Sequence, residues 1–180
     1  MPLLLGSASS YTRLVVTYGY FLLNDSTLLF KLLTLLCGAL VLACSEEYLR
    51  NHARHTLEYS IFVALALFFM LLLVCANNMI SSFFALVGFS LNLYILILYD
   101  LVSKPSREAG LKYFYLSTLS SGLFIYGAFL FYAAMSTGDF DVLAYGFASV
   151  DGTSKDLLRV GTLLLIFGLF FKLSAVPGHL

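Results

Sequence analysis

The chain has 180 residues, of which 61% are hydrophobic and 11% charged, and its formal net charge is zero. Soluble domains carry about 25% charged residues, so this composition predicts an integral membrane protein. The absence of net positive charge argues against a nucleic-acid partner. The apolar composition makes membrane lipids the expected surroundings.

Residues 1–26 contain one short apolar stretch, which lies between Arg13 and Asn24. We expect a peripheral or interfacial segment there, with a sixth membrane span as the alternative. Residues 27–180 are predicted to form a transmembrane helical domain, because a span needs about 20 apolar residues. The five predicted spans are residues 27–44, 59–76, 79–101, 111–135 and 157–176. The predicted fold class is therefore all-α integral membrane.

The second and third predicted spans lie in a long segment without charge. From Tyr59 to Tyr99 there is no Asp, Glu, Lys, Arg or His. Asn77 and Asn78 are residues typical of turns, and two serines follow them. This pattern predicts two helices that are separated by a turn at Asn77.

The fourth predicted span is rich in small residues. Such residues let helix backbones approach closely, and serine hydroxyls form hydrogen bonds between helices. We interpret them as ordinary membrane-helix packing positions. They are Ser117, Ser120, Ser121, Gly122 and Gly127.

The basic residues of the loops predict an orientation. Arg50, Arg54, Lys104 and Arg107 fall on one side of the membrane, whereas Arg13 and Lys155 fall on the other. By the positive-inside rule the first side faces the matrix or cytosol. The N-terminus is then expected on the intermembrane-space side.

The fifth predicted span contains the most informative residue, Lys172. The segment from Val160 to Phe171 has no charge, and Lys172 follows it directly. A lysine at the centre of a membrane helix costs about 2.5–3.5 kcal/mol, so it normally faces a protein interior or a water-filled path. Pro177 removes a backbone donor and predicts a break in the helix. The alternative is a lysine near a helix end that extends to the membrane surface.

Three other ionisable residues are candidates for a polar path. Lys112 lies near the start of the fourth span, with Glu108 one turn before it. Lys112 is equally consistent with an interfacial anchor, and Glu108 with a charge that the helix N-terminus favours. His179 is a candidate for the path, because imidazole in general titrates near neutral pH, or for a cap or solvent-exposed position.

Two sequence blocks together resemble one family. The first runs from Glu108 to Gly127, and the second is Phe171–Pro177 (FKLSAVP) followed by His179. They resemble the sixth and seventh helices of subunit 2 of NADH–quinone oxidoreductase, the NuoN type of respiratory complex I. The similarity extends from about Asp25 to the end of the chain.

This resemblance implies the first half of an antiporter-like subunit, which takes part in proton translocation coupled to electron transfer to ubiquinone. Lys172 matches the lysine of the family's discontinuous seventh helix, and Lys112 matches the lysine of its sixth helix. The chain would be an enzyme subunit without redox chemistry of its own. FMN, iron–sulfur clusters and ubiquinone are expected elsewhere in the complex, because the chain has no cofactor-binding or metal-ligand motif.

The chain departs from the family in three respects. The family has a fifth-helix glutamate that pairs with the lysine, whereas Ser90 falls at or near that position here. Gly178 replaces a phenylalanine, and the sequence ends before the eighth helix. We therefore expect a split subunit, in which a second chain carries the remaining helices beside other membrane-arm subunits.

The location implied by the resemblance, and favoured by the high Phe and Tyr content, is the mitochondrial inner membrane. Two alternative functions remain. One is a structural membrane-arm fragment that has lost proton pumping, which the missing glutamate favours. The other is a subunit of a related Mrp-type antiporter or membrane hydrogenase.

Overall fold

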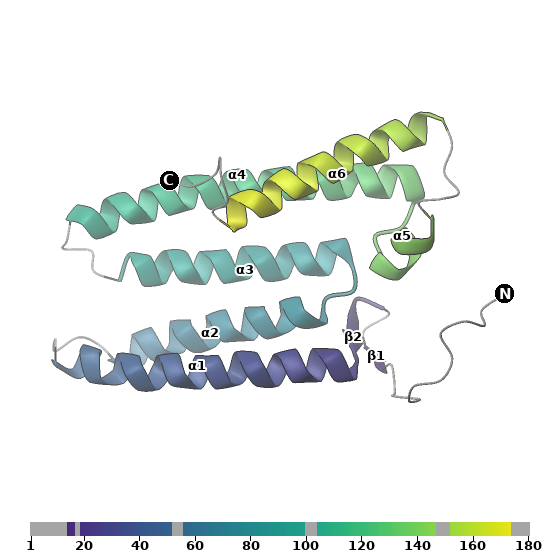
Figure 1. Ribbon diagram of the computed structural model, residues 1–180. Helices are drawn as coiled ribbons and strands as arrows, with labels where there is room; N and C mark the ends of the chain where they lie inside the picture. The colour runs from purple at the N-terminus through teal and green to yellow at the C-terminus, as the bar shows by residue number, and fades with distance from the viewer. Residues whose placement is uncertain (1–13, 17–18, 52–55, 100–103, 147–151, 174–180) are drawn as a thin grey trace.

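The computed structural model describes residues 14–16, 19–51, 56–99, 104–146 and 152–173. It consists of helices, together with one short hairpin near the N-terminus (Figure 1). The elements are β1 (Leu14–Val16), β2 (Phe21–Leu23), α1 (Asp25–Asn51), α2 (Thr56–Cys75), α3 (Met79–Ile97), α4 (Lys104–Met135), α5 (Phe140–Gly146) and α6 (Thr153–Lys172).

Four of the described helices, α1 to α4, are long and apolar enough to cross a membrane. The protein is therefore a multi-pass membrane protein, and the predicted all-α fold class is confirmed. The fifth predicted span corresponds to α6, which is 20 residues long and carries Lys155, Asp156 and Arg159 in its first half. Pro177, the predicted point of helix breakage, lies outside the described residues.

The helices lie side by side in the order α1, α2, α3 and α4, and α6 packs along α4 (Figure 1). The α4 and α6 backbones approach closely where two glycines face each other. A Cβ atom added to Gly127 would lie 2.9 Å from the carbonyl oxygen of Gly161. The absence of side chains at these positions therefore allows the contact.

The described part of the N-terminal segment forms an antiparallel hairpin in which Leu14 pairs with Leu23. Gly19 forms the turn with a φ of 95°, a conformation that glycine adopts without steric cost. The carbonyl of Tyr20 accepts hydrogen bonds from the Asn77 backbone N–H (2.9 Å) and from the Ser81 hydroxyl (3.0 Å). The hairpin is thus attached to the turn between α2 and α3.

That turn lies where the sequence predicted it, and it also holds the segment after α4. The side chain of Asn78 caps α3 by accepting a hydrogen bond from the N–H of Ile80 (2.9 Å). Its Nδ2 atom donates to Oδ1 of Asp139 (2.7 Å). The Met79 N–H donates to the carbonyl of Gly138 (2.9 Å). One end of the helix bundle is therefore fixed by polar contacts.

Burial follows the pattern expected of a protein surrounded by lipid. Many large apolar side chains point outward, including Leu36 and Phe129. The most deeply buried side chain among the described residues is a serine, Ser120, which is 1% exposed. Interhelical packing and hydrogen bonds, more than hydrophobic burial, hold such helices together.

Candidate functional site

Lys172 is the last residue of α6, and its side chain crosses to α3. Its Nζ atom donates to the hydroxyl oxygen of Ser90 (3.1 Å) and to the carbonyl oxygen of Leu86 (3.3 Å). The side chain is half-buried. The structure therefore brings together Lys172 and Ser90. The family resemblance matched Lys172 to the family's lysine and placed Ser90 at or near the position of its glutamate.

Ser90 is buried in the middle of α3. Its hydroxyl donates to the carbonyls of Leu86 (3.0 Å) and Val87 (2.9 Å), as serines in membrane helices commonly do. The same oxygen accepts the hydrogen bond from Lys172. Within the described residues, Lys172 forms no ion pair with a carboxylate. Among the described residues, the ammonium group therefore has only neutral oxygen atoms as hydrogen-bond acceptors.

The position of Lys172 is set one turn earlier in α6. The Ser120 hydroxyl donates a hydrogen bond of 2.7 Å to the carbonyl oxygen of Gly168, which connects α4 to α6. The rings of Phe83 and Phe124 stack at 6.3 Å between centroids and connect α3 to α4. Lys172 thus reaches α3 from a helix that is fixed through α4.

Glu108 and Lys112 form a separate pair on α4. Lys112 Nζ lies 2.7 Å from Glu108 Oε1. The Glu108 side chain is 70% exposed and the Lys112 side chain is 61% exposed. Exposed pairs spaced four residues apart contribute little to stability. The structure does not place this pair in contact with Lys172. His179 lies outside the described residues.

Two polar residues, one buried and one half-buried, were not singled out by the sequence analysis as site residues. Asn92, on α3, is 4% exposed and donates from Nδ2 to the carbonyl of Gly88 (2.8 Å). Tyr113, on α4, is half-buried and lines a small cavity together with Ser90. The sequence feature that could have identified them is a polar residue inside an apolar helix, because such residues normally face the interior of a helix bundle.

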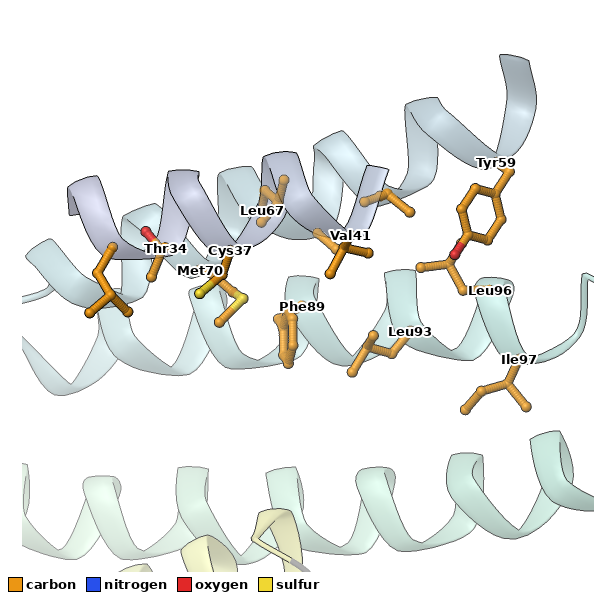
Figure 2. Close-up of a pocket in the computed structure, with 14 residues that line it drawn as sticks. Thr34, Cys37, Val41, Tyr59, Leu67, Met70, Phe89, Leu93, Leu96 and Ile97 are labelled. Atoms are coloured by element: carbon orange, nitrogen blue, oxygen red, sulfur yellow. The ribbon is translucent and has the colours of Figure 1, made fainter. Parts of the chain in front are cut away.

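A large apolar cavity of the described chain lies away from Lys172. It occupies about 570 Å³ between α1, α2 and α3, and Figure 2 shows Cys37 and Val41 of α1 lining it with Met70 of α2 and Phe89 of α3. None of the described lining residues is charged. The polar lining groups of the cavity are the side chains of Thr34, Cys37 and Tyr59. Among the described residues no cluster of His, Cys, Asp or Glu could hold a metal ion.

These features define a class: a helical, multi-pass membrane protein with a half-buried lysine held between helices by neutral polar groups. A model of the family described as "NADH:quinone oxidoreductase/Mrp antiporter, TM" matches residues 76–180, which include Ser90, Lys112 and Lys172. The chain belongs to this family of membrane subunits. The family resemblance based on the two sequence blocks is thereby confirmed.

Similar proteins include NADH-quinone oxidoreductase subunit N of Rhodospirillum rubrum, which is 41% identical over 150 residues, 83% of this chain and 31% of the relative. Subunit N of Pelagibacter ubique is 35% identical over 162 residues, 90% of this chain and 33% of the relative. The chain thus spans about a third of the length of the curated relatives it matches.

Two solved structures resemble the fold. A chain of respiratory complex I from Thermus thermophilus with bound aureothin has a TM-score of 0.70 and 30% identity, over 91% of this chain and 34% of that one. A chain of an archaeal membrane-bound sulfane sulfur reductase has a TM-score of 0.63 and 24% identity, over 67% of this chain and 24% of that one. The second match shows similarity of fold alone.

Proposed function

We propose that this chain is the N-terminal part of subunit 2 in the membrane arm of an NADH:quinone oxidoreductase. In this proposal Lys172 carries a proton during translocation that is coupled to electron transfer. The single observation that supports it best is the contact between Lys172 and Ser90, because both residues lie in the segment that matches the family.

The geometry suits a group that gains and loses a proton. An ammonium group has three hydrogen-bond donors, and the described residues supply two neutral acceptors. Neither acceptor carries a charge, so the site has a net positive charge when Nζ is protonated and none when it is not. A moving charge elsewhere in the assembly then changes the free energy of protonation at Lys172.

The remaining candidate residues have secondary parts in this proposal. Lys112 and Glu108 form an ion pair on the exposed surface of α4, where they can exchange protons with water. Pro177 would interrupt the helix after Lys172, and His179 would continue the polar path. Where the family resemblance expects a glutamate, this chain has Ser90 at or near the position, and the Ser90 hydroxyl accepts a hydrogen bond from Lys172.

The proposal includes partners that supply the rest of the reaction. Other membrane-arm subunits and a second chain with the remaining helices would surround this one, and FMN, iron–sulfur clusters and ubiquinone would be bound elsewhere in the complex. This chain would carry out no redox step. The Phe- and Tyr-rich composition favours the mitochondrial inner membrane. The distribution of basic residues in the loops favours an N-terminus on the intermembrane-space side.

The test is the number of protons translocated per NADH oxidised by the purified complex in vesicles. Lys172→Met should lower this number, since methionine has a similar length and no proton to transfer. Lys31→Met on α1 is the matched control, because it removes another membrane-helix lysine without touching the Ser90 contact. Unchanged stoichiometry in Lys172→Met, in a fully assembled complex, would contradict the proposal.

A second candidate function is purely structural, and the neutral partner of Lys172 favours it. In that case Lys172→Met would alter the stability of the complex but leave proton translocation intact. A third, an Mrp-type antiporter or hydrogenase subunit, is favoured by the breadth of the matching family. Mass spectrometry of the purified assembly tests it: absence of NADH-oxidising subunits would support this candidate over the first.

A further inference from the structure

The apolar cavity of about 570 Å³ between α1, α2 and α3 is closed on one side and open on another (Figure 2). Both α1 and α3 pack on α2, which forms the floor of the cavity. The floor residues Val63 and Ala66 are each 6% exposed, whereas Leu33 and Val41 of α1 are 54% and 51% exposed. The cavity is therefore reached from the α1 side, where the helix surface is exposed.

The hollow exists because two large side chains of α2 pack against glycines of the neighbouring helices. A Cβ added to Gly38 of α1 would collide with the side chain of Leu67, and one added to Gly88 of α3 would collide with the ring of Phe69. These contacts bring each neighbouring helix close to α2. Between them the floor is made of smaller residues, so the side chains of the described chain leave space above it.

The polar groups of the lining do not require water. The Thr34 hydroxyl already donates to the carbonyl oxygen of Lys31 (2.9 Å). A free cysteine such as Cys37 behaves as a small apolar residue with a weak donor. Apolar cavities stay dry, and walls without a neighbouring atom lose dispersion contacts. An apolar occupant is therefore favoured over water.

The length of the cavity matches one half of a bilayer. Along α2 the lining extends from Tyr59 to Met70, a rise of about 17 Å at about 1.5 Å per residue. The hydrocarbon core of a bilayer is about 30 Å thick, so one leaflet contributes about 15 Å. A chain that enters at one membrane surface would thus fill the cavity and end near the middle of the bilayer.

Tyrosines mark the end of the cavity that lies at the membrane surface. Tyr59 is in the first turn of α2, and its ring meets the ring of Tyr99 edge to face, with 5.6 Å between centroids. Tyrosine is enriched where the membrane meets water, because its ring is apolar and its hydroxyl is polar. The Ser106 hydroxyl donates to the carbonyl of Ile97 (2.6 Å), which attaches the start of α4 to the same end.

Charged residues of both signs lie at this end of the bundle. Arg107 follows Ser106 on α4, Glu58 precedes Tyr59 on α2, and both are exposed. Such a surface accepts either a zwitterionic or an anionic headgroup. The apolar cavity, and not a pocket for one headgroup, is thus the selective element.

We propose that this cavity binds one acyl chain of a membrane phospholipid from the leaflet at the Tyr59 end. The headgroup would lie beside Tyr59, and the chain would pack between α1 and α3 over Val63 and Ala66. A flexible chain adapts to the irregular walls and supplies the contacts that the hollow lacks. The inference depends on the position of the helices in a membrane and not on the proton role of Lys172.

The test is a cryo-EM structure of the whole complex in nanodiscs of phosphatidylcholine that is brominated in the middle of its acyl chains. We expect continuous density for one chain in the cavity, with a bromine signal between α1 and α3. Cys37→Phe places a ring in the cavity and should remove this density. Native mass spectrometry should then detect one phospholipid fewer per complex. Cys44→Phe is the matched control, because Cys44 is an exposed cysteine of the same helix outside the lining.

Three results would overturn the inference: an empty cavity in the wild-type complex, a cavity filled by a helix of another polypeptide, or one filled by the branched, unbrominated tail of a quinone. Equal loss of density in both cysteine variants would also contradict it. If Cys37→Phe prevents assembly, Val41→Phe tests the same space from the next turn of α1. None of these results depends on the proton stoichiometry of Lys172→Met, so the site and the proposed function can fail separately.

Discussion

The hydroxyl of Ser120 donates a 2.7 Å hydrogen bond to the carbonyl oxygen of Gly168, one helical turn before Lys172. Ser120 therefore controls the position of the lysine without touching it. The bond joins α4 to the end of α6 at a place where neither residue contacts lipid. Its removal should affect both the stability of the helix pair and the precision of the Lys172–Ser90 contact.

Ser120→Ala should lower the stability of the assembled complex. Interhelical hydrogen bonds in membranes contribute about 0.6 kcal/mol on average and up to about 1.7 kcal/mol. Thermal unfolding of the purified complex measures the change. Ser121→Ala is the matched control, since the Ser121 hydroxyl bonds within its own helix. An equal loss in both variants would contradict a specific role for the Ser120 bond.

Gly127→Ala should separate α4 from α6. The added Cβ would lie 2.9 Å from the Gly161 oxygen and 3.1 Å from the Leu165 nitrogen, and backbone atoms cannot move aside as a flexible side chain can. We expect less assembled complex and a lower unfolding temperature. Gly122→Ala, where no atom lies within 4 Å, should leave both unchanged. Normal assembly of the Gly127 variant would show that the helices can shift at little cost.

Ser90→Ala and Lys172→Met should have non-additive effects on stability. Each variant removes one partner of the same hydrogen bond, so the double variant should lose less than the sum of the two. A coupling free energy on the order of 1 kcal/mol is expected for one such bond. Denaturant unfolding of all four combinations measures it. Strict additivity would mean that the two side chains do not interact in the assembled protein.

Lys112→Met should leave stability almost unchanged, because the pair with Glu108 is largely exposed. Any fall in proton translocation would then report on proton handling and not on folding. Lys104→Met, at the start of the same helix, is the control for loss of a surface charge. A large drop in unfolding temperature for Lys112→Met alone would indicate that a neighbouring subunit buries the pair.

Two variants of Asn78 separate its two contacts. Asn78→Ser should keep the cap on α3, since serine also accepts the hydrogen bond from Ile80, but it is too short to reach Asp139. Asn78→Ala should lose both contacts, with a typical cost of about 1 kcal/mol for the cap. Thermal unfolding should therefore rank wild type above Asn78→Ser and Asn78→Ser above Asn78→Ala. Equal stability of the two variants would mean that the cap contributes nothing.

Much of the architecture followed from the sequence. The charge-free segment and the turn at Asn77 correctly predicted that α2 and α3 are separate helices. The position of Lys172 at the end of an apolar segment made it a candidate site residue. Small residues were correctly assigned to helix packing at Ser120 and Gly127, although Gly122 meets no neighbour. The sequence predicts these helices, turns and packing positions because each of them depends on residues that are close together in the chain.

The partners of the site residues were harder to predict. Ser120 and Ser121 are adjacent and chemically identical, yet one bonds across to α6 and the other bonds within α4. Which of them faces a neighbour depends on the rotation of the helix about its axis, and apolar residues on all sides of a membrane helix leave that rotation unspecified. The small cavity beside Ser90 depends on the same rotation of α3 and α4.

The serine-rich interior has a consequence for how this protein can change over evolutionary time. In a water-soluble enzyme, a polar reaction centre can be altered while an apolar core elsewhere keeps the fold intact. Here the hydroxyls near Lys172 also hold the helices together, as Ser120 does through Gly168. Substitutions that tune chemistry therefore also alter assembly, and compensating changes should arise in the facing helix.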